Sequence, residues 1–244
     1  GPDDIQLGVR EEVRDVARTL ARYLDLVVMR TYSHRVLLDF AKYFEKPVIN
    51  GLSDLEHPCQ AVGDFFTISE VLGSLKGKKI AFVGDGNNVL NSLLILAARL
   101  GANFSYATPA RYGPGERILS GAMKEAKGTG AEITGTHRPD QAVRDADIVY
   151  TDVWVSMGEE DQGDKRKHFR GFQVNRSLLD QASKNALLMH CLPAHRGEEI
   201  TDEVIESKQS IVFEQAENRL HVQKAILLYL LRKSEKKVEK GVRA

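Results

Sequence analysis

Four apolar runs of the sequence end in polar residues that could do chemistry. "LDLVVMR" ends at Arg30, "KIAFVGDGNN" leads into Asn88, "DIVYTDVW" carries Asp152, and "ALLMHCLP" contains Cys191. A guanidinium suits phosphate or carboxylate oxygens, a carboxylate suits a cation, and a thiol can handle a proton or simply be buried. Core packing accounts for the apolar runs but not for the residues that follow them. Four such endings around one crevice therefore indicate a pocket.

Strand-like and helix-like segments alternate along the chain and must position these residues. Strands are expected at 24–30, 46–52, 79–85, 103–109, 131–136, 147–154, 186–193 and 210–215. Helices are expected at 13–24, 33–44, 59–72, 89–100, 115–127, around Gln141 and at 216–231. This alternation predicts an α/β fold with parallel sheets flanked by helices. In such sheets, ligands bind beyond the carboxyl ends of the strands.

The composition sets limits on the function. The 244 residues carry 34 Lys plus Arg and 34 Asp plus Glu, so the formal net charge is zero and gives no footprint for nucleic acid or an anionic membrane. No apolar run approaches the roughly 20 residues that span a bilayer. The two cysteines, Cys59 and Cys191, fit a reducing compartment, which favours the cytoplasm. An organellar matrix stays open if a transit peptide has been removed.

The glycine loop "FVGDGNNVLNS" does not predict a dinucleotide site. Val89 stands where the third small residue of that fingerprint belongs, and the next strand ends "YATP", with no acidic residue for a ribose. The loop still presents amides at a helix N-terminus, which suits a carboxylate. A plain strand–helix turn explains the same residues.

Five motifs occur together in an order that resembles a known family. They are "HPCQ" at 57–60, "GDGNN" at 84–88, "DVWVSMG" at 152–158, "HCLP" at 190–193 and "QAENR" at 215–219. "HPCQ" is typical of transcarbamylases in general, whereas "DVWVSMG" together with "HCLP" is similar to ornithine carbamoyltransferase. The resemblance runs from "DIQLG" to the final helix.

The resemblance implies a fold, a reaction and an assembly. Carbamoyl phosphate and the δ-amine of L-ornithine would give citrulline and phosphate, in arginine metabolism, without metal or organic cofactor. Two α/β domains would form homotrimers with active sites between subunits. We expect an incomplete carbamoyl-phosphate domain at 1–60, an interdomain helix at 61–74 and an ornithine domain at 75–215. A C-terminal helix at 216–244 would pack back on the first domain.

The resemblance also implies two overlapping groups of site residues. Carbamoyl phosphate would be held by Arg30, His57, Gln60, Leu192 and Arg219, with Gln6 reaching in from the neighbouring subunit. Ornithine would be bound by Asn88, Asp152, Ser156, Met157, Cys191 and Leu192. The catalytic residues among these would be Arg30, His57, Asp152 and Cys191.

Elementary chemistry is consistent with these roles. His57 can hydrogen-bond the carbamoyl oxygen, where negative charge grows as the amine attacks, and Gln60 can accept from the carbamoyl NH2. An alkyl amine with a pKa near 10.4 costs roughly 4–5 kcal/mol to neutralise at pH 7, so the site must lower that pKa or accept the proton. Asp152 can pair with the amine, and Cys191 can contact it and assist its deprotonation. Other interpretations stay open: His57 as a helix cap, Arg30 and Arg219 as surface ion pairs, and Cys191 as an inert buried residue.

The sequence departs from the family in one respect. The Ser-Thr-Arg-Thr run that the family uses for carbamoyl phosphate is absent from the 244 residues. We therefore expect either a portion of a complete enzyme or a truncated, non-catalytic form that binds ornithine. A transferase for a related amine such as putrescine is a third possibility. The polar segment 155–172 is interpreted either as a lid over ornithine or as a solvated surface loop.

Overall fold

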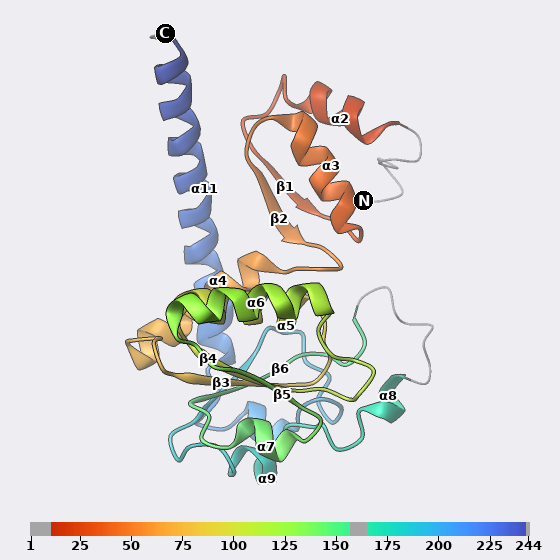
Figure 1. Cartoon of the computed structure of the whole chain (residues 1–244), viewed down its shortest axis with the longest axis vertical. Coiled ribbons are helices and arrows are strands. Elements are labelled where there is room, and N and C mark those ends of the chain that lie inside the picture. The colour runs from red at the N-terminus through yellow and green to blue at the C-terminus, as the bar shows by residue number, and fades with distance from the viewer. Residues whose placement is uncertain (1–10, 157–164, 243–244) are drawn as a thin grey trace.

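The structure is a computed structural model that describes residues 11–156 and 165–242 (Figure 1). Its strands are β1 (Val27–Arg30), β2 (Val48–Leu52), β3 (Lys79–Val83), β4 (Asn103–Ala107), β5 (Ile133–Thr136), β6 (Ile148–Thr151) and β7 (Leu187–His190). Its helices are α2 (Val13–Leu20), α3 (His34–Phe44), α4 (Pro58–Leu72), α5 (Asn88–Leu100), α6 (Glu116–Thr129), α7 (Pro139–Val143), α8 (Lys165–His168), α9 (Arg176–Leu179), α10 (Asp202–Ile205) and α11 (Val212–Val242).

The strands form two parallel sheets. One contains β1 and β2, and the other has the order β5-β4-β3-β6-β7. Helices α5 and α6 cover one face of the larger sheet, while α7 and α9 lie on the other (Figure 1). The predicted α/β fold with two flanked parallel sheets is confirmed. The chain turns in opposite directions after β3 and after β6, so the carboxyl ends of these neighbouring strands mark a switch point where ligands bind.

The smaller sheet is held by a compact apolar cluster. Ala17 of α2 packs with Phe40 and Phe44 of α3, and Val27 and Met29 of β1 join them. The alternating exposure along β1 follows from this packing, because only every second side chain faces the helices. We call α2, α3, β1 and β2 the small unit, and β3–β7 with α5–α10 the large unit.

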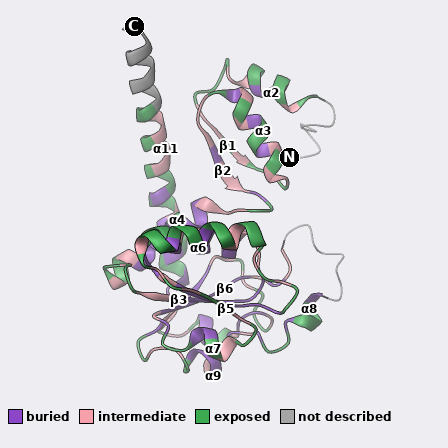
Figure 2. Ribbon diagram, viewed as in Figure 1, coloured by how far each residue is buried: buried purple, intermediate pink, exposed green. Residues whose placement is uncertain are grey.

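The large unit has an apolar core on each face of its sheet. Phe82 of β3 stacks on Tyr150 of β6 beneath α4–α6, and Trp154 stacks on Phe169 on the other side. Strands β3 and β6 are almost entirely buried, as expected for parallel strands covered on both faces. Figure 2 shows the buried sheet and the exposed outer face of α6.

Hydrogen bonds join the two units at the start of α5. The segment after β2 is tied to α5 by Asn88 Nδ2 donating to the carbonyl of Ser53 (2.7 Å) and by Asn91 Nδ2 donating to the carbonyl of Leu55 (3.0 Å). The amide of His57 donates to Oγ of Ser92 at 2.7 Å. The residues that follow β2 are thereby held against the residues that follow β3.

One predicted element is wrong. Segment 210–215 is not a strand: Ser210 makes a single parallel bridge to Leu188, and α11 begins at Val212, earlier than the predicted residue 216. Val212, Gln215, Asn218 and Val222 are buried at helical spacing, so this face packs as a helix against α4 and β7. The predicted domain boundaries stay predictions.

Candidate active site

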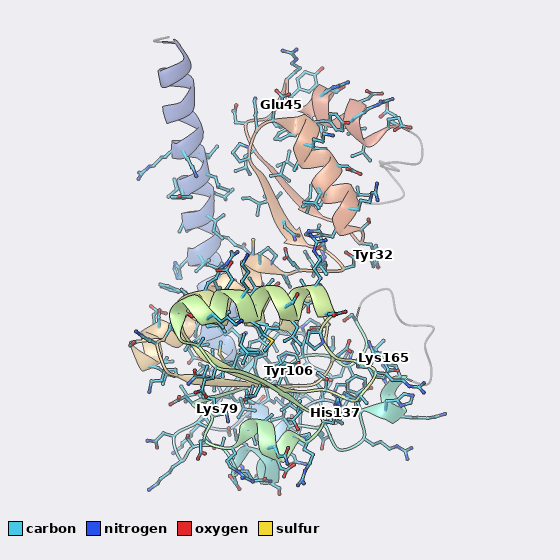
Figure 3. All side chains as sticks on the ribbon, viewed as in Figure 1. Tyr32, Glu45, Lys79, Tyr106, His137 and Lys165 are labelled. Carbon is cyan, nitrogen blue, oxygen red and sulfur yellow. The ribbon has the colours of Figure 1, made fainter. Side chains whose placement is uncertain are left out.

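A pocket of about 760 Å³ lies at the carboxyl ends of strands from both sheets. Two of its lining residues, Tyr32 of the small unit and Lys165 of the large unit, lie on the same side of the molecule (Figure 3). The pocket brings together seven of the predicted site residues: Arg30, His57, Asn88, Asp152, Ser156, Cys191 and Leu192. Residues far apart in the chain therefore converge as the strand-end rule predicts.

Asp152 and Cys191 touch each other at the carboxyl ends of β6 and β7. The Cys191 thiol donates to Oδ1 of Asp152 at 2.9 Å, and Nδ2 of Asn87 donates to Oδ2 at 2.7 Å. Oδ1 of Asn87 accepts from the amides of Val89 and Leu90, so the same side chain caps α5. Asn87 thus fixes the carboxylate and the helix terminus together, a role that the sequence did not reveal.

The Cys191 sulfur is a thiol rather than a thiolate. Burial raises its pKa well above the usual range, and the neighbouring Asp152 charge raises it further. Because only a thiolate is a strong nucleophile, this environment opposes covalent catalysis by Cys191. The thiol is suited instead to orienting an amine beside Asp152.

His57 lines the pocket in its uncharged form. It precedes α4 as the N-cap residue, but its side chain does not cap the helix. Burial lowers the pKa of the imidazole to about 4, and the positive charges of Arg219 and Arg30 act in the same direction. Its Nδ1 is buried with no hydrogen-bond partner among the described residues. The helix-cap alternative therefore loses its main support, since the ring faces the pocket instead.

Asn88 and Ser156 enter the pocket from the large unit. Nδ2 of Asn88 donates to the carbonyl of Ser53 at 2.7 Å, which uses one of its two hydrogens, so the second hydrogen and the amide oxygen can serve a ligand. Ser156 lies at the end of the described segment 11–156. Gln6, Met157 and the rest of 157–164 within the predicted lid fall outside the described residues.

The backbone of Leu192 is set by buried neighbours. Its amide donates to Nδ1 of His190 at 2.9 Å, and Nε2 of His190 lies 3.1 Å from Oε1 of Glu199. A nitrogen that accepts from an amide carries no proton, so Nε2 of His190 is the donor to Glu199. Leu192 therefore offers only its carbonyl to a substrate.

Gln60 and Arg219 meet outside this set of lining residues. Arg219 donates from Nη1 to Oε1 of Gln60, and Nε2 of Gln60 donates to Oδ1 of Asp64 at 2.8 Å. Gln60 lies in the first turn of α4, where its backbone amide donates to the carbonyl of His57 at 3.1 Å. The pair thus lies beside His57, but the carbonyl predicted to accept from the carbamoyl group accepts from Arg219 here.

The pocket contains a buried ion pair that the sequence did not predict. Lys165 Nζ lies 2.7 Å from Oδ2 of Asp85, and the two side chains are only 3% and 8% exposed. The amine also lies 5.4 Å from the ring centroid of Tyr112. The available signal was Asp85, a carboxylate directly after a buried strand, which requires a cation or several donors. Nothing in the sequence indicates that the cation comes from Lys165.

The second glycine of "GDGNN" has a packing role. A Cβ on Gly86 would lie 2.4 Å from the carbonyl carbon of Gly113, and the Gly86 amide donates to the carbonyl of Tyr112 at 2.7 Å. This close backbone contact requires glycine. It accounts for the motif without a dinucleotide phosphate.

One group of possible metal ligands overlaps the pocket: Asp152, His190 and Cys191 have ligand atoms within 4.8 Å of one another. Both ring nitrogens of His190 are already engaged by Leu192 and Glu199. All three side chains therefore make hydrogen bonds within the protein at this place.

Comparison with protein families defines the class. The model described as the carbamoyl-P binding domain of aspartate/ornithine carbamoyltransferase matches residues 1–70, and the model described as its Asp/Orn binding domain matches residues 76–230. The chain is therefore built from the two domains of these carbamoyltransferases.

Similar proteins narrow the class. An ornithine carbamoyltransferase of Methanoculleus marisnigri is 53% identical over 231 residues, covering 94% of this chain and 74% of that protein. One of Pyrococcus furiosus, described as anabolic, is 51% identical over 93% of this chain and 73% of its own length. A solved structure of ornithine carbamoyltransferase from Pyrococcus furiosus has a TM-score of 0.91 at 50% identity, over 94% of this chain and 74% of that one. The chain belongs to the ornithine carbamoyltransferase family.

Proposed function

We propose that the pocket transfers the carbamoyl group of carbamoyl phosphate to the δ-amine of L-ornithine, giving L-citrulline and phosphate. The observation that carries this proposal is the Cys191–Asp152–Asn87 chain of hydrogen bonds facing the same cavity as an uncharged His57 and Arg30. It combines groups for an amine with groups for an anionic carbonyl donor. Family membership supports the same reaction.

Carbamoyl phosphate binds at the end of the pocket formed by the small unit and α4. Arg30 holds phosphate oxygens, because a guanidinium makes strong charge-assisted hydrogen bonds to them. The uncharged His57 donates a hydrogen bond to the carbamoyl oxygen, where negative charge grows during attack. Gln60 and Arg219 complete this half of the site. In the complex, the NH2 group of carbamoyl phosphate donates to the Gln60 side-chain carbonyl, which accepts from Arg219 in the structure.

Ornithine binds at the carboxyl ends of β3, β6 and β7. Asp152 pairs with an amine of ornithine, and Cys191 contacts the δ-amine from the neighbouring strand. Asn88 and Ser156 bind the amino-acid end, and the Leu192 carbonyl accepts from the incoming nitrogen. Met157 and the neighbouring subunit's Gln6 complete the proposed set.

The chemical step needs a neutral amine. The δ-ammonium first loses a proton, which costs roughly 4–5 kcal/mol at pH 7 for an unperturbed amine, and a nearby carboxylate can accept it. The new bond joins this nitrogen to the carbamoyl carbon, and the bond to the phosphate oxygen breaks with its electron pair. The second nitrogen proton then leaves with solvent or phosphate. No covalent bond to Cys191 forms.

The amine specificity tests the proposal. The intact protein is assayed with carbamoyl phosphate and either L-ornithine or putrescine, the diamine that is ornithine without its α-carboxylate. We expect citrulline formation with ornithine and at least about 100-fold lower kcat/KM with putrescine, since several polar partners of the carboxylate would be left unpaired. Equal or better use of putrescine would assign the site to the rival amine. Absence of turnover with either would favour the non-catalytic interpretation.

The finer biological context is also a proposal. We infer a homotrimer with sites between subunits, a cytoplasmic location and a role in arginine biosynthesis. The relative of Pyrococcus furiosus that is described as anabolic supports the last point. Across residues 11–156 and 165–242, none of the helices combines the length and hydropathy that crossing a bilayer requires.

A further inference from the structure

A fully buried carboxylate, Asp64, lies behind the carbamoyl-phosphate half of the site. It follows Gln60 by one turn of α4 and has no exposed surface. We propose that Asp64 is a positioning residue that fixes the amide orientation of Gln60, so that the Gln60 carbonyl faces Arg219 and the carbamoyl group. This inference rests on the proposed function.

Asp64 receives three hydrogen bonds from donors on three elements. Nε2 of Gln60 donates to Oδ1 at 2.8 Å, and Nε2 of Gln215 on α11 donates to the same oxygen at 2.7 Å. The hydroxyl of Tyr150 on β6 donates to Oδ2 at 2.9 Å. A carboxylate with three such donors matches the ionised, acceptor-only form.

The donors cannot exchange roles with the carboxylate. Gln215 must present its NH2 group to Asp64, because its Oε1 accepts from the backbone amide of His190 at 3.0 Å. Burial, and next the Asp64 charge, raise the pKa of Tyr150 well above its usual range, so the phenol keeps its proton. Burial raises the pKa of Asp64 to about 6, and the three hydrogen bonds and Arg219 oppose that rise. Asp64 is therefore ionised at neutral pH and held in one orientation.

This arrangement decides which end of the Gln60 amide faces the substrate. A side-chain amide can present either oxygen or nitrogen, and the two ends differ little in shape. Because Asp64 accepts only from nitrogen, the Gln60 oxygen must point the other way, where Arg219 donates to it. The carbamoyl NH2 is also a donor, so it meets the matching end of the amide. With the amide reversed, two donors would face each other.

The test removes the acceptor at position 64 in the intact protein. Asp64→Ala should raise the KM for carbamoyl phosphate about 10- to 100-fold, because a hydrogen bond to a charged group that orients Gln60 is lost. Asp64→Asn keeps one acceptor for Gln60 and should rescue the KM to within about threefold to fivefold of the wild type. Both variants are also made in a Gln60→Ala background, where the substitutions at 64 should have no further effect on this KM.

Thr67→Val is the matched control. The Thr67 hydroxyl accepts from Nδ2 of Asn218 at 3.0 Å, so this variant also removes a buried hydrogen bond between α4 and α11, one turn beyond Asp64 and about two turns from Gln60. It should lower stability without changing the KM for carbamoyl phosphate. If Asp64→Ala behaves like Thr67→Val, or if its effect on KM persists in the Gln60→Ala background, the positioning role is wrong.

Two further readouts keep the outcomes distinct. If Asp64→Ala does not fold, Asp64→Asn must still raise the KM by at least about twofold, and an unchanged KM overturns the inference. Calorimetric binding of phosphonoacetamide, which replaces the bridging oxygen of carbamoyl phosphate with a methylene, needs no turnover. If the wild type binds it but forms no citrulline, the proposed function fails while the affinities of the position 64 variants still test Asp64.

Discussion

At the scale of single residues, the contact between Cys191 and Asp152 explains why a thiol follows a buried strand. The thiol donates to a carboxylate that Asn87 holds from the other side, and its raised pKa keeps the proton on sulfur. An incoming ammonium can replace the thiol as the donor to Asp152. The sulfur then remains as a neighbour that orients the nitrogen without adding a charge.

Cys191→Ala tests this orientation. The variant removes one hydrogen-bonding contact, so kcat/KM for ornithine should fall about tenfold or more, while the KM for carbamoyl phosphate stays within about twofold. Steady-state citrulline assays with each substrate varied give both constants. Cys59→Ala is the matched control, because Cys59 is the other cysteine and donates to the carbonyl of Asn50 away from the pocket lining. A Cys191→Ala enzyme with wild-type kinetics would contradict the role of the thiol.

The uncharged state of His57 has a consequence for stability. Its folded-state pKa of about 4 is below the value of 6.5 expected when unfolded, so the unfolded chain binds more protons between these pH values. The free energy of unfolding should therefore fall as the pH is lowered from 6.5 to 4. Asp64 changes the free energy of unfolding in the opposite direction. Its folded-state pKa of about 6 exceeds the value of 3.8 expected when unfolded, so this contribution grows as the pH falls from 6 to 3.8.

Comparison of wild type with His57→Gln isolates the histidine contribution. Denaturant unfolding at several pH values should show the wild type losing stability relative to the variant as the pH drops through that window. Parallel curves for the two proteins would mean that His57 titrates normally in the folded chain.

At the scale of helices and strands, α4 and α11 fit together where α4 has glycine. The Cδ of Arg219 lies 3.0 Å from the position of a Cβ on Gly63, which is closer than ordinary packing permits. Gly63→Ala should gain helix propensity yet displace Arg219 from Gln60. We expect a KM for carbamoyl phosphate that rises severalfold without loss of stability.

Gly121→Ala in α6 provides the comparison. No atom lies within 4 Å of the Cβ that it would introduce, and the site is exposed. It should add about 0.5–1 kcal/mol of stability and leave both KM values unchanged. If Gly63→Ala has the same KM values and the same gain in stability as Gly121→Ala, the position of Arg219 does not affect the binding of carbamoyl phosphate.

The sequence was most informative about elements and their ends. Apolar runs bounded by glycine and polar residues predicted eight strands, and seven of them are strands in the structure. The strand-end rule placed Asp152 and Cys191 at the pocket. The strand predicted at 210–215 was wrong, because a short apolar run cannot be assigned to strand or helix without its packing partner. Lys165 was missed because its partner, Asp85, is distant in sequence. Asp64 lies one turn from Gln60, but its burial among donors from Tyr150 and Gln215 depends on distant segments.

At the scale of the whole molecule, the small unit leaves apolar surface in contact with solvent. Among the described residues its sheet has two strands, and Val28 of β1 and Leu38 of α3 are 58% and 56% exposed. A two-stranded sheet is marginal alone, so further contacts are expected to cover it. This agrees with the proposed assembly through subunit contacts.

Sedimentation or light scattering at micromolar concentration tests the assembly. We expect three times the mass of a single chain. Replacing Val28 and Leu38, which is 56% exposed, with lysine should shift the species toward lower mass if these residues lie at an interface. A wild type that remains a single chain at these concentrations would exclude the proposed trimer.

The central claim is that ornithine is received by Asp152 between its neighbours Asn87 and Cys191. Asp152→Asn keeps the size of the side chain but removes the negative charge that pairs with the amine. The most direct measurement is kcat/KM for ornithine in citrulline formation by the wild type and this variant, at saturating carbamoyl phosphate. We predict a fall of at least about 100-fold, from the loss of charge-assisted hydrogen bonds. A variant with the kcat/KM of the wild type would contradict the account.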